Sequence, residues 1–395
     1  MVSKTKSSNS IIQLIKSEDR EPSTTIRNTI RHLINKVTSL EQASSILDEC
    51  ASAATNYHYT LSTLIQWKST SDDNGQSLLF QKVLQTDVND EVSLSILSLI
   101  MIYAVSEKRD VLPIADIRRA CMIKDDQPLF EFVRNTELYR KFAKDRDAIY
   151  LGSTGLQDTV EVQLRTPNLL RVSSSNHHQA AFTAILTIPM FQMRMRGLNE
   201  VKLEFIAQGR MWCLTFRKAI HDPQSSKKKK SFSLWRRTRM NTESAADNWQ
   251  IGLSLTDQSE STPVQATITF LPSTWSTVAT ALRGGLKDSQ LKNKDEVEIE
   301  LSTKPGERLV SEPHSAQSES RVKVVKGQTQ GIYASLDSGI LSSSGSIYIE
   351  EDGSLIVILE AILAMTVQPS KQKSVKKVQK TDEPIVDDDI ASVCL

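Results

Sequence analysis

Cysteine is scarce in this chain of 395 residues, and the four that occur are far apart. None belongs to a CxxC pair, which argues against a zinc ribbon and a disulfide scaffold and favours a reducing compartment. Cys394 is second from the end, so the closing letters SVCL do not form a prenylation box. The other three cysteines are Cys50, Cys121 and Cys213.

Histidine is also rare, and of the six histidines only His177 and His178 are adjacent. Neighbouring residues on a strand point to opposite faces, so this pair is poorly placed to share a metal ion. The simpler interpretation is a polar loop, SSSNHHQ, between two strands. The sequence therefore predicts neither a metal site nor a bound cofactor.

Recognisable catalytic motifs are missing as well. The chain contains no GxxxxGK[ST] loop, no GxGxxG after a strand, no GxSxG elbow, no HExxH and no kinase set. Nothing in the sequence pairs a histidine with Cys121 or Cys213, and Cys213 is expected in the core of a β domain. We expect a protein that is not an enzyme. Because catalytic groups can come from distant positions, an enzyme with a site in the β domain stays open as an alternative.

Long apolar runs are absent too. The longest, 94–105 and 354–367, are shorter than the roughly 20 residues that a membrane-spanning helix needs. The opening MVSKTKSSNS contains no apolar signal-peptide region. We expect a soluble intracellular protein that is not secreted, located in the cytoplasm, with the nucleus or a membrane surface as further locations.

The first part of the chain has the periodicity of helices. Residues 1–23 are polar and expected to be disordered, and a helical domain is predicted over 24–157. Thr38 and Glu41 form a capping-box pattern before the second helix. Three short helices followed by the strand DAIYLGS also fit the outline of a winged helix, which small helical bundles share. The first helix places five apolar residues on one face: Ile26, Ile30, Leu33, Ile34 and Val37.

After about residue 158 the hydrophobic period changes from that of helices to that of strands. EVKLEFIAQGRMWCLTFRKA predicts a hairpin that turns at Gln208-Gly209, and Asp352-Gly353 is a strong hairpin signal. The predicted fold class is α+β: a helical N-terminal region followed by an antiparallel β-sandwich or jelly-roll-like domain over 158–367. Its two long polar insertions, a basic loop over 222–245 and a loop over 302–321, are expected to be mobile, and the charged tail 368–395 to be disordered.

One segment breaks the balance of charge in a chain whose net charge is only +1. Between Asp222 and Glu243 there is no acidic residue, and seven cations gather within Lys227–Arg239, which we call the basic aromatic segment. Its candidate binding residues are the cations Lys227, Lys228, Lys229, Lys230, Arg236, Arg237 and Arg239, with the aromatics Phe232 and Trp235 between them.

Three interpretations of this segment compete. It is a solvated loop that keeps the protein soluble, although exposed aromatics add nothing to solubility. It binds single-stranded nucleic acid, with cations on phosphates and rings stacked on bases. It binds an anionic membrane, where the cations meet lipid headgroups and the aromatics enter the interface. The same cations also match the composition that nuclear import reads.

A second basic group, Arg194, Arg196 and Arg210, lies near the predicted hairpin. If MFQMRMRG is extended, Arg194 and Arg196 share one face and continue the surface of the basic aromatic segment. The equally simple alternative is that these charges protect an edge strand from aggregation.

The whole layout resembles viral non-enzymatic proteins such as movement and matrix proteins, and this resemblance is one of architecture only. It implies a protein that brings nucleic acid to membranes or to other proteins. Our preferred hypothesis is a structural protein of movement type that binds single-stranded nucleic acid, RNA above DNA. The alternative is a peripheral membrane scaffold of matrix type that acts by oligomerisation. Protein partners and a homo-oligomer are expected in both cases.

Overall fold

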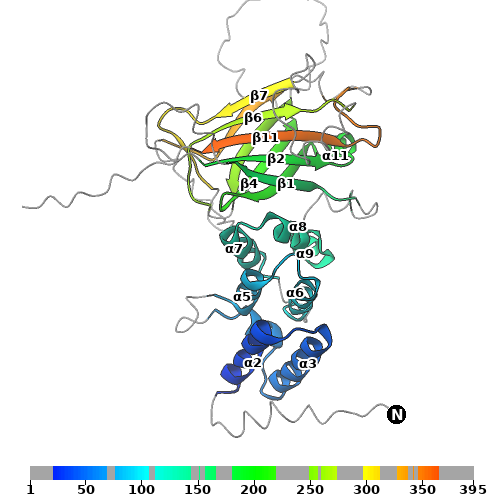
Figure 1. Ribbon diagram of the computed structural model, residues 1–395, viewed down its shortest axis with the longest axis vertical. Coiled ribbons are helices and arrows are strands. Elements are labelled where there is room, and N and C mark those ends of the chain that lie inside the picture. Colours follow the sequence, from blue (N-terminus) through cyan, green and yellow to red (C-terminus); the bar gives the residue numbers. More distant parts are fainter. Residues whose placement is uncertain are drawn as a thin grey trace, which may run out of the picture. The chain divides into compact units, whose positions relative to one another are not determined.

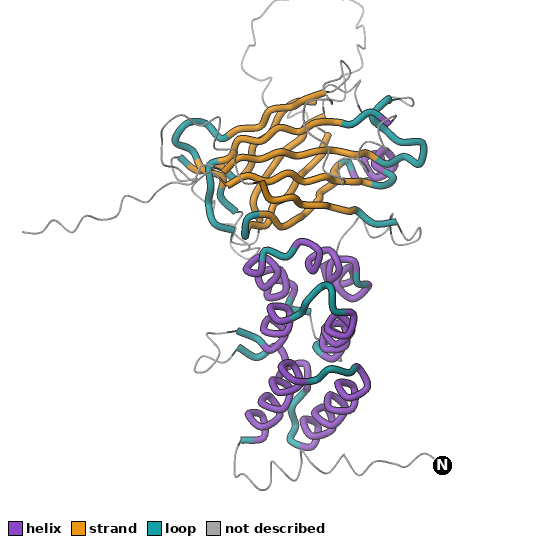
Figure 2. Tube along the Cα trace, in the orientation of Figure 1, coloured by secondary structure: helices purple, strands orange, loops and turns teal. Residues whose placement is uncertain are grey.

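The computed structural model shows an α+β protein. It describes residues 21–68, 76–105, 112–143, 151, 156–165, 180–218, 249–256, 259–273, 297–311, 327–336, 341 and 346–363. All the helices and strands described below belong to one compact unit, Met1–Met365. Figure 2 shows most of the helices in one region and the strands in another, with helix also present beside the sheets.

The helical region begins where proline can start a helix. Pro22 occupies the first turn of α2, where the missing N–H costs no hydrogen bond. The N-cap of the next helix is Ser39, whose hydroxyl accepts a hydrogen bond from the Gln42 N–H at 3.3 Å, so the predicted cap at Thr38 was one residue too early. The helices are α2 (Pro22–Lys36), α3 (Leu40–Asn56), α4 (Leu61–Gln66), α5 (Leu78–Gln85), α6 (Glu91–Tyr103), α7 (Ile114–Lys124), α8 (Gln127–Asn135) and α9 (Glu137–Ala143).

Substituting the observed cap gives a direct test of this helix start. Ser39→Ala removes the acceptor for a free N–H of the first turn, so we expect the free energy of unfolding to fall by about 1 kcal/mol. Thr38→Ala is the matched control, since Thr38 is also exposed and accepts no capping bond at this helix. Urea denaturation measures both variants. A larger loss of unfolding free energy in the Thr38 variant would show that Thr38 is the N-cap, as the sequence predicted.

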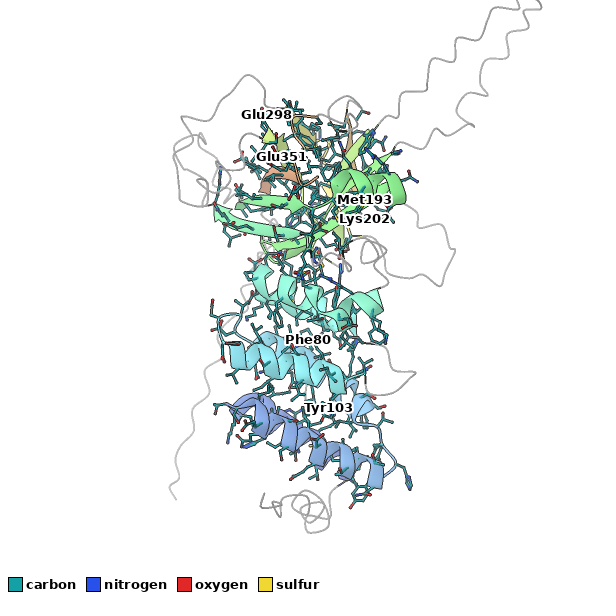
Figure 3. The ribbon with its side chains drawn as sticks, turned by 90° about the vertical axis from the view of Figure 1, so that its right-hand side faces the viewer. Phe80, Tyr103, Met193, Lys202, Glu298 and Glu351 are labelled. Atoms are coloured by element: carbon teal, nitrogen blue, oxygen red, sulfur yellow. The ribbon has the colours of Figure 1, made fainter. Side chains whose placement is uncertain are left out.

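The apolar stripe predicted for the first helix is confirmed. Ile26, Ile30, Leu33 and Ile34 are buried, and Val37 packs partly buried against the same core. Phe80 is buried in this core and is labelled among the helices in Figure 3. Of the strand expected at 147–153, only Leu151 is among the described residues, and it is helical rather than extended, so the winged-helix outline is not confirmed.

The described strands form two antiparallel sheets and one short parallel pair (Figure 1). The five-stranded sheet has the order β1-β2-β11-β6-β7, and the four-stranded sheet has the order β10-β5-β4-β3. The pair is β8 (Arg308–Leu309) with β9 (Gln328–Thr329). The sheet strands are β1 (Thr159–Arg165), β2 (Ala180–Ile188), β3 (Glu200–Ala207), β4 (Arg210–Lys218), β5 (Trp249–Thr256), β6 (Val264–Phe270), β7 (Val297–Ser302), β10 (Gly331–Leu336) and β11 (Leu355–Leu363).

Side chains from both large sheets meet in one hydrophobic core. The ring of Phe182 on β2 lies 5.4 Å from that of Trp212 on β4, and the rings of Phe216 and Phe270 lie 6.5 Å apart. Pairs at these centroid distances gain stability beyond the area that they bury. Residues alternate along β6, since every second residue from Val264 to Phe270 lies in this core.

The predicted hairpin between β3 and β4 is confirmed. Glu200 pairs with Arg217 at one end and Ala207 with Arg210 at the other. Gln208 and Gly209 join the strands with φ of 55° and 63°. Two successive left-handed residues form the tight turn whose twist suits an antiparallel hairpin.

The segment 190–197 is helical, so the condition under which Arg194 and Arg196 would share one face is not met. Helix α11 spans Phe191–Leu198. Its buried residues are Phe191, Arg194 and Met195, which share one face at helical spacing. The ring of Phe191 lies 5.1 Å from that of Phe216 and 6.0 Å from that of Trp249. Packing of this face against the β core therefore outweighs the alternating pattern of the sequence.

Candidate functional site

The basic aromatic segment belongs to the connection between β4 and β5. β4 ends at Lys218, β5 begins at Trp249, and these two residues are paired in register. The segment itself lies outside the described residues, so its role stays a prediction, but both ends of its connection are fixed side by side. We call the end of the four-stranded sheet at Lys218 and Trp249 the anchor end. The candidate residues outside the described part are Lys227, Lys228, Lys229, Lys230, Phe232, Trp235, Arg236, Arg237 and Arg239.

Helix α11 lies at this anchor end. The Lys218 N–H donates to the carbonyl of Asn199, the residue that caps the C-terminus of α11, at 3.0 Å. α11 also contacts β3, and Met193 of the helix and Lys202 of β3 are labelled on the same side of the β region in Figure 3. Arg196, in the last turn of α11, is exposed. The structure therefore brings Arg196 to the end of the sheet from which the basic aromatic segment departs.

Arg194 does not belong to that surface, which corrects the expectation from sequence. Its side chain is fully buried and forms a two-bonded ion pair with Asp158, at 2.5 Å to Oδ1 and 3.0 Å to Oδ2. Helical geometry turns Arg194 toward the interior while Arg196, two residues on, faces outward. Arg210 begins β4, at the opposite end from Lys218, and pairs with Glu260 at 3.1 Å. The three arginines are therefore not brought together.

The outer face of the four-stranded sheet is polar near the anchor end. The cross-strand pairs align Lys202, Thr215, Gly252 and Tyr333 in one row across all four strands. The neighbouring row begins with Glu200, which forms an exposed ion pair with Lys202 at 3.1 Å. The rest of that row, toward β10, consists of Arg217, Gln250 and Ser335.

Sequence reasoning missed a polar junction between the helices and this sheet. Arg118 of α7 donates to both carboxylate oxygens of Glu204 on β3, at 2.5 and 2.8 Å. The same guanidinium donates to the Tyr139 hydroxyl at 3.2 Å and to the Thr256 hydroxyl at 3.3 Å. Arg134 of α8 donates to the Glu204 carbonyl at 3.2 Å. These partners are far apart in the sequence, so no local pattern of residues predicts their contacts.

The three described cysteines are buried, and burial raises the pKa of each thiol to about 12. A thiol with so high a pKa carries almost no thiolate at neutral pH, and the thiolate is the nucleophile. Cys213 lies on β4, as expected, but it pairs with Glu204 on the outer face rather than with the residues between the sheets. Cys50 and Cys121 lie in the helical core.

Two features are absent from the described part of the chain. No group of three or more histidine, cysteine, aspartate or glutamate side chains in it is arranged to hold a metal ion, and His177 and His178 lie outside it. Nor does any described helix have the length and hydropathy that crossing a membrane requires.

Comparison with known proteins adds no relative. No protein-family model matches the chain, and no curated protein matches its sequence. A function for the anchor end must therefore be argued from its residues.

Proposed function

We propose that this protein is a non-enzymatic binding protein that holds single-stranded nucleic acid, RNA above DNA, through the basic aromatic segment. The observation that supports the proposal best is the pairing of Lys218 with Trp249. This pairing holds both ends of the connection that carries the seven cations at the anchor end of the four-stranded sheet. A folded body that presents cations and aromatic rings together suits a polymer of phosphates and unpaired bases.

Chain connectivity limits how far these cations can lie from the sheet. Lys227 is nine residues beyond Lys218, and Arg239 is ten residues before Trp249. Even a fully extended chain of that length spans no more than roughly 35 Å. The cations therefore stay within reach of a strand that crosses the anchor end, where Arg196 and Arg217 add to the positive charge.

A salt series on the full chain tests the proposal. In the test variant, Lys227, Lys228, Lys229, Lys230, Arg236, Arg237 and Arg239 are changed to alanine. We expect wild-type affinity for a labelled oligouridine to fall steeply with salt, because each phosphate contact adds roughly 0.7 to the logarithmic slope for single strands. The variant should lose most of this slope, up to about 5 if all seven cations bind phosphate.

The tail offers a matched control, because it holds a second lysine-rich run. Changing Lys371, Lys373, Lys376, Lys377 and Lys380 to alanine removes comparable charge elsewhere in the chain. We expect this control to keep the wild-type slope. An equal loss of salt slope in both variants would show that the overall charge of the protein, and not the basic aromatic segment, sets the salt dependence. Binding to anionic liposomes and not to RNA would overturn the proposal in favour of the matrix-type scaffold.

A further inference from the structure

Tyr333 is a large aromatic side chain on the outer face of the four-stranded sheet. It is 45% exposed, although it lies in β10 and between residues that alternate inward. Its cross-strand partner on β5 is Gly252, and Gly331 lies two residues before it on the same face of β10. A single exposed tyrosine needs no explanation, but the presence of two glycines beside this side chain on the same face of the sheet does need one.

The two glycines leave room for the ring to lie along the sheet. A Cβ atom built on Gly252 would lie 2.2 Å from Cδ1 of Tyr333, and one built on Gly331 would lie 2.9 Å from its Cε2. Any larger residue at either position would push the ring away. The ring therefore occupies the space that side chains at Gly252 and Gly331 would fill. It lies close to the backbones of β5 and β10.

Arg217 of β4 completes the arrangement. Its guanidinium carbon lies over the Tyr333 ring, 4.2 Å from the ring centroid. Its Nε donates to the side-chain oxygen of Gln250 at 3.0 Å, which fixes the plane of the guanidinium group. A cation over a ring is stabilised by the electrons of the ring, so the planar guanidinium and the aromatic ring are held at one place.

We propose that Tyr333 and Arg217 form a stacking site for an unpaired base of the single-stranded nucleic acid. The proposal rests on the proposed function and extends it from phosphate contacts to a base contact. Proteins that bind single strands stack bases on aromatic rings and on arginine planes, which works for every base because each has a π face. Arg217 is the last residue but one of β4, so the site lies at the anchor end.

A purely structural explanation makes a different prediction. Aromatic rings also cover glycines on sheets to replace the contacts that glycine lacks. In that case, replacing Tyr333 would change stability and leave affinity for nucleic acid unaffected. Leucine is the useful substitute, because it still covers Gly252 with apolar atoms but offers no ring. Phenylalanine keeps the ring and removes only the hydroxyl.

The test compares two ligands of equal length and charge on the full chain: an oligouridine, and an abasic oligomer that has phosphates and sugars but no bases. We expect Tyr333→Leu to weaken binding of the oligouridine about tenfold, the size of one lost stacking contact. Binding of the abasic oligomer should not change. Tyr333→Phe should bind both ligands as the wild type does.

Trp67 provides a matched control in the helical region. It is 43% exposed and lies under the guanidinium of Arg27, 5.5 Å away, so Trp67→Leu also removes an exposed ring beneath an arginine. We expect it to bind oligouridine as the wild type does. An equal loss in this control, or an equal loss of both ligands in Tyr333→Leu, would overturn the stacking site.

The two proposals fail in distinguishable ways. If the wild type binds neither oligomer, the proposed function and the stacking site both fall. If the seven-alanine variant loses oligouridine while Tyr333→Leu binds as tightly as the wild type, only the stacking site falls. A direct measurement stands beside these: photo-crosslinking of an oligomer that contains 5-iodouridine should attach to the peptide that carries Tyr333. Attachment confined to other peptides would also overturn the site.

Discussion

Asp158→Ala will lower the free energy of unfolding by about 3–5 kcal/mol, the cost of leaving one partner of a buried ion pair uncompensated. Arg194 is fully buried, and Asp158 accepts hydrogen bonds from two of its guanidinium nitrogens. Once the carboxylate is removed, the guanidinium keeps its charge, because arginine does not lose its proton in proteins. Chemical denaturation followed by circular dichroism measures the loss.

The sheet provides a matched control for this prediction. Arg165 and Glu360 form an ion pair at 2.9 Å whose side chains are 46% and 47% exposed, so Glu360→Ala should cost less than about 1 kcal/mol. The double change Asp158→Ala with Arg194→Met removes both buried charges and should recover part of the stability. Equal costs for the buried and the exposed pair would show that burial of Arg194 does not set the energy.

The same residue shows where sequence reasoning fails. MFQMRMRG alternates apolar and polar residues, which is the signature of a strand, and nothing nearby contradicts it. The helix forms because Phe191 packs against Phe216 and Trp249, which are distant in sequence. Local preference yields to tertiary packing in such cases. The β3–β4 hairpin was predictable because its signals, the alternation and the Gln208-Gly209 turn, are local.

The candidate site also has one part that local sequence signals predict and one part that depends on the tertiary fold. A run of seven cations without an acid is visible in any reading of the sequence, so the basic aromatic segment needed no structure to be noticed. The pairing of Tyr333 with Gly252 and the contact of Arg217 with its ring depend on the order of strands β10, β5 and β4. Strand order is a property of the whole fold, and a single sequence carries no local signal for it.

Glu204→Ala will separate the unfolding of the helices from that of the sheets. The wild type should unfold in one transition, because Ile206 of β3 and Met211 of β4 belong to the same buried cluster as the helical core. The Arg118–Glu204 pair spans this junction with two short charge-assisted bonds. Removing the carboxylate leaves a largely buried guanidinium without its counter-charge, at a cost of about 2–4 kcal/mol.

Two probes are needed to see the separation. Circular dichroism follows the helices. Fluorescence follows Trp212 and Trp249 in the β core, with Trp67, Trp235 and Trp275 changed to phenylalanine in every protein compared. The two probes should give coincident transitions without the Glu204 change and different midpoints with Glu204→Ala. Glu200→Ala is the matched control on the same strand, since its pair with Lys202 is exposed, and it should keep the transitions coincident. Coincident transitions in Glu204→Ala would mean that the remaining contacts suffice to couple the helices to the sheet. These are the apolar contacts of Ile206 and Met211 and polar bonds such as that of the Ile206 N–H to Gln127 Oε1 at 2.7 Å and that of the Gly209 N–H to Asp125 Oδ1 at 2.8 Å.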